Sequence, residues 1–188
     1  MRKSIMATLT ANRNRPRRII AAIALTVATV GVTVTTASPA VADGSYSGRA
    51  TIWGSGLLAG DWDDEGVVNV RTHRNSDVTC LWQKVLVADG YLAWTEVDGI
   101  FGDGTHAATV RWQRDRGLTA DGSAGRVTWA KAGDRIRENG IQGSYRVGYY
   151  EGARSDFPIR RTSSGVHQFW DFADGPLRTA SYNVRTCR

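Results

Sequence analysis

The apolar residues between positions 76 and 88 recur at steps of three and four, which is the spacing of one face of an α-helix. Asn75, Ser76 and Asp77 come just before this run and offer side-chain oxygens that can cap a helix, and Gly90 follows it. The pattern therefore predicts a helix over residues 76–88. Its expected buried face consists of Val78, Leu81, Trp82, Val85 and Leu86.

An eight-residue motif, Asp-Gly-x-x-Gly-x-x-Thr, occurs at residues 98–105 and again 23 positions later at residues 121–128. Asp-Gly favours a tight turn, because the Asp side chain can accept a local backbone N–H and Gly tolerates positive φ. The second Gly of the motif lets the chain enter a helix at close quarters. Each copy therefore predicts a corner followed by a helix, the first ending near Gly117 and the second near Gly133. The expected bulky core residues of this three-helix unit are Trp82, Trp112 and Trp129.

From about residue 144 the apolar residues alternate with polar ones, which is typical of half-buried β-strands. The alternation is clearest at 145–149 and at 180–184, and the aromatic-rich run 166–172 lies between them. Turn signals rich in Gly and Ser separate the runs. We therefore expect an antiparallel meander of three or four strands, which makes the fold class α+β.

The segment between residues 43 and 66 is rich in Gly and Asp, which favours turns and loops over most of its length. We interpret Arg49 to Trp53 as a short strand and the acidic run from Asp61 to Glu65 as a solvated turn. The expected organisation is a leader over 1–42, an N-terminal extension over 43–66, a helical domain over 67–133 and a β-rich extension over 134–188.

The first 42 residues have the order of a secretory signal peptide: a basic cluster at 13–18, an apolar run at 19–34 and a small-x-small ending at Ala42. The apolar run has about 16 residues, fewer than the roughly 20 that a spanning helix needs. We therefore expect cleavage after Ala42, export, and no membrane attachment afterwards. Removal of six basic residues leaves 24 − 6 = 18 basic against 18 acidic residues. This balance argues against nucleic-acid binding, which needs a basic surplus.

The chain has two cysteines, Cys80 and Cys187. In an exported protein an even cysteine count indicates a disulfide first, and two buried free thiols are the alternative. A Cys80–Cys187 bond would staple the meander onto the first helix.

The stretch from about Val67 to Ala132 resembles the type 1 peptidoglycan-binding domain family. Asp103 and Arg126 depart from it, because proline often occupies these two positions after the helix-entry glycines. The resemblance implies a small helical domain that binds peptidoglycan and needs no metal or cofactor. The matching residues are Trp82-Gln83, Leu86, Gly90-Tyr91, Asp98-Gly99, Phe101-Gly102, Thr105, Ala107-Ala108, Trp112-Gln113, Gly117-Leu118, Asp121-Gly122, Gly125 and Thr128-Trp129.

On this resemblance we expect the polymer, glycan strand and stem peptide together, to lie in a shallow groove near the two helix entries. Helix N-termini there would present free N–H groups and a partial positive charge to the stem-peptide carboxylates. Trp94 precedes the first corner and is the best candidate for an exposed aromatic ring. The expected groove residues are Tyr91, Trp94, Asp98, Phe101, Asp103, Thr105 and Arg111.

Catalytic patterns are weak in this sequence, and we expect a non-catalytic binder. The histidines form neither H-x-H nor H-E-x-x-H, which are common zinc-ligand patterns; we expect His73 and His106 to be exposed and His167 to be half-buried. A muramidase needs two carboxylates across a cleft. The available glutamates, each in a turn-like context, are Glu65, Glu96, Glu138 and Glu151.

The leading hypothesis is thus a secreted, cell-wall-associated monomer that binds peptidoglycan. Two alternatives stay open. One is a secreted interaction or inhibitor module that binds another protein through its aromatic meander. The other is a wall-lytic enzyme whose active site has no recognised motif.

Overall fold

The computed structural model of the chain describes residues 48–171 and 175–187. The expected signal peptide, residues 1–42, lies outside these residues. In the described part, no helix is both long enough and apolar enough to cross a bilayer.

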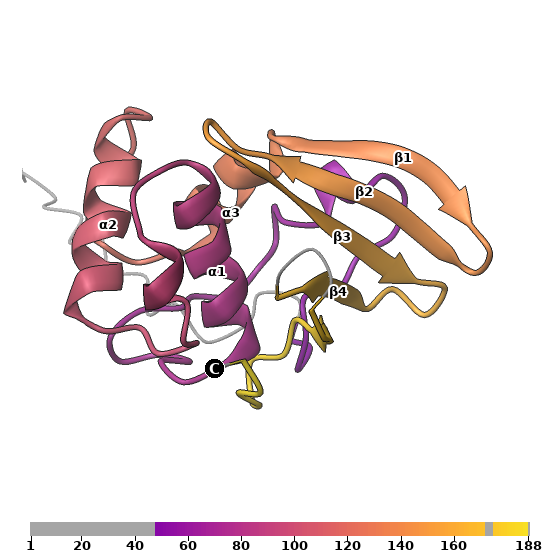
Figure 1. Ribbon diagram of the computed structural model, residues 1–188, viewed down its shortest axis with the longest axis horizontal. Helices are drawn as coiled ribbons and strands as arrows, with labels where there is room; N and C mark the ends of the chain where they lie inside the picture. Colours follow the sequence, from indigo (N-terminus) through magenta and orange to yellow (C-terminus); the bar gives the residue numbers. More distant parts are fainter. Residues whose placement is uncertain (1–47, 172–174, 188) are drawn as a thin grey trace, which may run out of the picture. The chain divides into compact units, whose positions relative to one another are not determined.

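Three α-helices form where the sequence predicts them: α1 Asp77–Ala88, α2 Asp103–Arg114 and α3 Arg126–Gly133. Ser76 caps α1, because its side chain accepts a hydrogen bond from the backbone N–H of Thr79. Every residue of α1 is buried, including its polar face. Figure 1 shows why: α1 lies between α2 on one side and the sheet on the other.

The C-terminal part forms a five-stranded antiparallel sheet in simple meander order. This confirms the predicted type of structure, although the sheet begins eight residues earlier than expected and has more strands. The predicted alternation at 180–184 is not a strand, because the last strand ends at Thr179. The strands are β1 Ile136–Gln142, β2 Tyr145–Glu151, β3 Asp156–Thr162, β4 His167–Trp170 and β5 Leu177–Thr179.

The N-terminal segment ties the sheet to the helices. The predicted strand at 49–53 appears as two isolated bridges, in which Thr51 pairs with Ser181 and Trp53 pairs with Val166. A short 3₁₀ helix, η1 Leu58–Gly60, follows. Further on, Val68 pairs with Ala124 next to the second corner.

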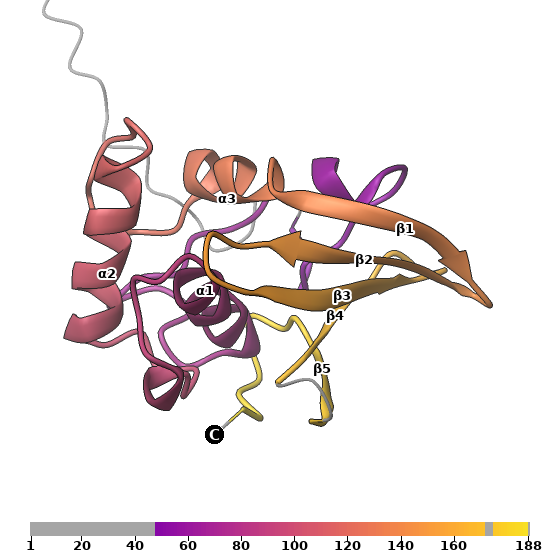
Figure 2. The same cartoon turned by 45° about the horizontal axis from the view of Figure 1, so that its top comes forward.

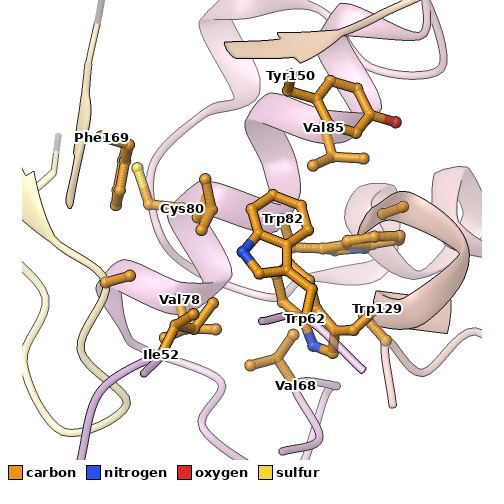
Figure 3. Close-up of a cluster of buried hydrophobic side chains, with 14 of the residues drawn as sticks. Ile52, Trp62, Val68, Val78, Cys80, Trp82, Val85, Trp129, Tyr150 and Phe169 are labelled. Carbon is orange, nitrogen blue, oxygen red and sulfur yellow. The ribbon is translucent and has the colours of Figure 1, made fainter. Parts of the chain in front are cut away.

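A chain of aromatic rings runs from the helices into the sheet. Trp82 lies edge-on to Trp112 at 5.1 Å and to Trp129 at 5.2 Å between ring centroids. Trp62 lies edge-on to Trp129 at 5.2 Å and stacks on Tyr150 at 6.2 Å. Figure 3 shows Trp62, Trp82, Trp129 and Tyr150 within one cluster. The helices and the sheet therefore share one hydrophobic core.

Asp89 joins the two halves by hydrogen bonds as well. It follows α1, and its side chain is 1 % exposed. Its Oδ2 accepts bonds from Trp112 Nε1, Arg116 Nη2 and the Tyr150 hydroxyl, each at 2.7 Å. Its Oδ1 accepts from the backbone N–H of Ala153 at 2.9 Å. One carboxylate thus binds α2, the turn after α2, strand β2 and the β2–β3 loop.

Candidate functional site

A buried glutamine from α1 holds the first Asp-Gly corner. The Gln83 amide nitrogen donates to Asp98 Oδ1 at 2.9 Å, to the Ile100 carbonyl and to Thr105 Oγ1. Its amide oxygen accepts from the backbone N–H of Gly99 at 2.7 Å. Gly99 has φ +71°, so the turn needs glycine at this position.

The second corner repeats this arrangement with a glutamine from α2. Gln113 donates to Asp121 Oδ1 at 2.9 Å, to the Ser123 carbonyl and to Thr128 Oγ1, and its oxygen accepts from the backbone N–H of Gly122. The duplicated motif is therefore a duplicated clamp, in which the Gln of each Trp-Gln pair closes the next corner. The Asp and Thr residues of both motifs serve the fold.

Three of the expected groove residues face the protein interior or the clamp. Phe101 is fully buried, and Thr105 is 4 % exposed. Asp98 is half-buried, and its carboxylate accepts from Gln83 and from the backbone N–H of Ile100. Phe101 and Thr105 are thus buried in the protein, and the Asp98 carboxylate is used in the hydrogen bonds of the first corner. None of the three side chains offers a surface to a polymer.

The other four expected residues are exposed or half-exposed, two on the loop 91–98 and two on α2. The loop runs along α2: Arg111 Nη2 donates to the Tyr91 carbonyl at 2.9 Å, and Glu96 lies against Gly104 in the first turn of the helix. In Figures 1 and 2 this loop passes between α1 and α2. We call the exposed side of this loop and of α2 the loop–α2 face; its members are Tyr91, Trp94, Asp103 and Arg111.

Trp94 begins a 3₁₀ turn, η2 Trp94–Glu96, and its side chain is the large aromatic group of this face. It is 50 % exposed, whereas Trp82, Trp112 and Trp129 are fully buried. Lys84 Nζ lies 4.5 Å from the centroid of the Trp94 ring, in cation–π contact. Burial lowers the pKa of Lys84 to about 8. The Trp94 ring is thus held by its contact with Lys84, while half of its surface stays open to solvent.

The acidic run at 61–65 is not the solvated turn that the sequence suggested. Asp61 is buried, where it contacts the Arg161 guanidinium and binds His167 Nε2 at 2.7 Å. Glu65 is fully buried and accepts a 2.6 Å hydrogen bond from the Tyr182 hydroxyl. Desolvation raises the pKa of Glu65 to about 8. His167 is also fully buried, and burial lowers its pKa.

The other two histidines are half-buried, in contrast to the expected exposure. The His73 ring packs on Tyr182 at 4.8 Å, and the His106 ring covers Gly122 of the second corner. Within the described ranges no group of three or more His, Cys, Asp or Glu residues is placed to hold a metal ion.

Cys80 and Cys187 are both buried, and their side chains lie 2.5 Å apart. The cysteines are free in this structure, so the expected disulfide is not confirmed. Their proximity does show that the C-terminus packs on α1, as the predicted staple required.

A groove of about 460 Å³, which no sequence pattern predicted, lies at the end of the sheet that carries the β1–β2 turn. The β1–β2 turn, the β3–β4 turn and the N-terminal segment meet there. We call it the tip groove. Its lining consists of residues 53–56, Ile141, residues 143–146 and residues 161–165.

Residues 76–131 match the model of the family described as "Putative peptidoglycan binding domain". The match starts at the cap of α1 and ends inside α3, so it covers both corners, both glutamine clamps and the loop–α2 face. No curated protein and no solved structure matches the chain. The helical unit of this chain, residues 76–131, is therefore similar to the peptidoglycan-binding domain family.

Proposed function

We propose that the protein binds bacterial peptidoglycan through the loop–α2 face, with Trp94 as its main contact. The family match over 76–131 supports the class of ligand. The observation that carries the choice of surface is the exposure of Trp94, since the other tryptophans of the helical unit are fully buried. Exposed aromatic rings supply large apolar contacts at low conformational cost.

The loop–α2 face also carries the charge that the ligand needs. Arg111 is exposed on α2, and it can donate to a stem-peptide carboxylate while one of its nitrogens holds the Tyr91 carbonyl. The Tyr91 ring is half-exposed beside it, and its hydroxyl donates to Asp115 at 2.7 Å. In this proposal the sugar ring stacks on Trp94 and the peptide lies towards Arg111.

Replacing Trp94 with alanine is expected to weaken wall binding about tenfold or more, because truncating a central aromatic contact commonly costs about 2 kcal/mol. The measurement is co-sedimentation of the mature protein with insoluble peptidoglycan over a concentration series. Val127→Ala is the matched control, because Val127 is 66 % exposed on α3, away from the loop–α2 face. Equal binding by Trp94→Ala and wild type would refute this surface, and a wild-type protein that stays in the supernatant would refute the function.

We propose further that the protein acts outside the cell and without catalysis. The four glutamates considered for muramidase chemistry have other partners or no access to solvent. Glu65 is buried, Glu138 pairs with Arg146, Glu151 pairs with Arg137, and the exposed Glu96 accepts a hydrogen bond from the backbone N–H of Ala93. Turbidity of cell-wall suspensions is expected to stay constant with purified protein. A loss of turbidity would favour the wall-lytic alternative.

The exported protein is proposed to carry a Cys80–Cys187 disulfide, because the two side chains already lie together in the core. Alkylation of the denatured protein without reductant should leave both cysteines unlabelled, and labelling should become complete after reduction. Mass spectrometry reads the difference directly. Full labelling of protein purified from the medium, before any reduction, would show two thiols instead.

A further inference from the structure

The tip groove lies next to a β-bulge in strand β1. The β1–β2 register shifts between Glu138 and Gly140, and Gly140 has φ +89°. Such bulges bend a strand and redirect its side chains, and they are common next to binding sites. Beyond the bulge, Ile141 is 67 % exposed at the groove wall. Figure 1 shows this turn at the end of the sheet farthest from α2.

The opposite wall is fixed by Trp53. Its indole N–H donates to the Ser164 carbonyl at 2.7 Å, and Arg49 stacks over its ring at 4.0 Å. A Cβ on Gly165 would lie 2.2 Å from Trp53 Nε1, so only glycine fits against the indole. The groove is therefore a preformed feature, and its volume falls in the range of about 300–1,000 Å³ that small-molecule sites occupy.

The charges at the groove are already balanced by the protein. Arg161 contacts buried Asp61 and donates to the Gly56 carbonyl, and Arg146 pairs with Glu138. An anionic ligand would therefore meet no uncompensated cation among the lining residues. The groove offers exposed hydroxyls from Ser55, Ser144 and Ser163, four glycine backbones and the half-exposed Tyr145 ring. The Arg160 guanidinium lies 3.9 Å from the centroid of that ring.

A peptide strand is a poor match for this site. Peptides that add to a sheet pair with an edge strand, and the edges here are β1 and β5. The groove lies across the ends of the strands instead. Hydroxyls, aromatic rings and neutral donors are the chemistry that recognises a sugar.

We infer that the tip groove is a second binding site, for a short uncharged oligosaccharide, formed by Trp53, Tyr145 and the serine hydroxyls around them. It stands apart from the loop–α2 face, because the two sites share no residue. The β1–β2 turn, which lines the groove, lies at the end of the sheet away from α2 (Figure 2). A protein with both sites would bind a glycan-rich surface at two points, and its overall affinity would exceed that of either site alone.

The test is a titration of ¹⁵N-labelled mature protein with tri-N-acetylchitotriose, followed by amide and indole chemical shifts. We expect shifts centred on Trp53, Gly143, Tyr145 and Gly165, with a dissociation constant on the order of 1 mM. Ser163→Trp, which fills the groove from an exposed position, should weaken binding about tenfold or more. Ser155→Trp, in the exposed β2–β3 loop, is the matched control and should bind as wild type does.

Two comparisons keep this inference separate from wall binding. On titration of Trp94→Ala with tri-N-acetylchitotriose, the shifts at Trp53, Gly143, Tyr145 and Gly165 should be the same as in wild type, even if this variant no longer sediments with peptidoglycan. A trimer of galacturonic acid should bind more weakly than the uncharged trimer. Shifts that are absent from the groove or confined to the loop 91–98, unchanged binding by Ser163→Trp, or tighter binding of the acidic trimer would each overturn the inference.

Discussion

Replacing Asp89 with alanine is expected to lower the free energy of unfolding by about 3–5 kcal/mol, because it leaves buried partners without their acceptor. The Asp89 carboxylate accepts from Trp112, Arg116, Tyr150 and the backbone of Ala153. These groups come from α2, the turn after it, β2 and the β2–β3 loop, so the loss would weaken the contact between helices and sheet. Urea denaturation followed by tryptophan fluorescence measures the change.

Asp134 offers a closely matched control for this substitution. It follows α3 as Asp89 follows α1, but its side chain is 63 % exposed and pairs only with Lys131 on the surface. Asp134→Ala should cost less than about 1 kcal/mol, in line with exposed ion pairs. If the two variants lose similar stability, Asp89 does not join the helices to the sheet as we describe.

Glu65 is expected to make the protein less stable as the pH rises. Its pKa is raised from 4.5 to about 8, mainly by desolvation, so the folded state keeps a proton that the unfolded state releases. Its stabilising contribution is complete below about pH 4.5 and is lost progressively as the pH rises to about 8. At about 1.4 kcal/mol per pH unit, the loss over this window is on the order of 5 kcal/mol.

Glu65→Gln isolates this effect, because glutamine fills the same space and does not ionise. The variant should gain stability relative to wild type between pH 5 and pH 8, measured as the difference in unfolding free energy at each pH. The difference removes contributions from other titrating groups, such as Lys84 and His167. Glu151→Gln, at a 42 % exposed carboxylate, should give a small difference throughout. A pH-independent difference for Glu65→Gln would contradict the assignment.

Because the helices and the sheet share one core, a truncated chain is a poor test of which part binds the wall. Trp62 and Tyr150 lie in the aromatic chain that begins in the helices, although one precedes the helical unit and the other follows it. A chain ending at Gly133 would lose Tyr150 and the sheet, and its exposed core would obscure any binding result. Point substitutions such as Trp94→Ala are therefore the better test of the site.

The sequence by itself determined the local structure. The three- and four-residue spacing placed α1, and the duplicated Asp-Gly motifs placed the corners before α2 and α3. Alternation placed the meander, and the same motifs carried the resemblance to the family that matches residues 76–131. These features depend on residues close together in the chain, so their periodicity and turn chemistry are readable from one sequence.

Only the tertiary structure decided which polar residues are buried and which face is open. Asp61 and Glu65 stand in an acidic run that reads as solvated, yet Arg161, His167 and Tyr182, about 100 or more residues later, enclose them. The tip groove likewise needs three segments that no local pattern connects. Burial depends on contacts between distant segments, and a carboxylate has the same identity in the sequence whether water or an arginine surrounds it.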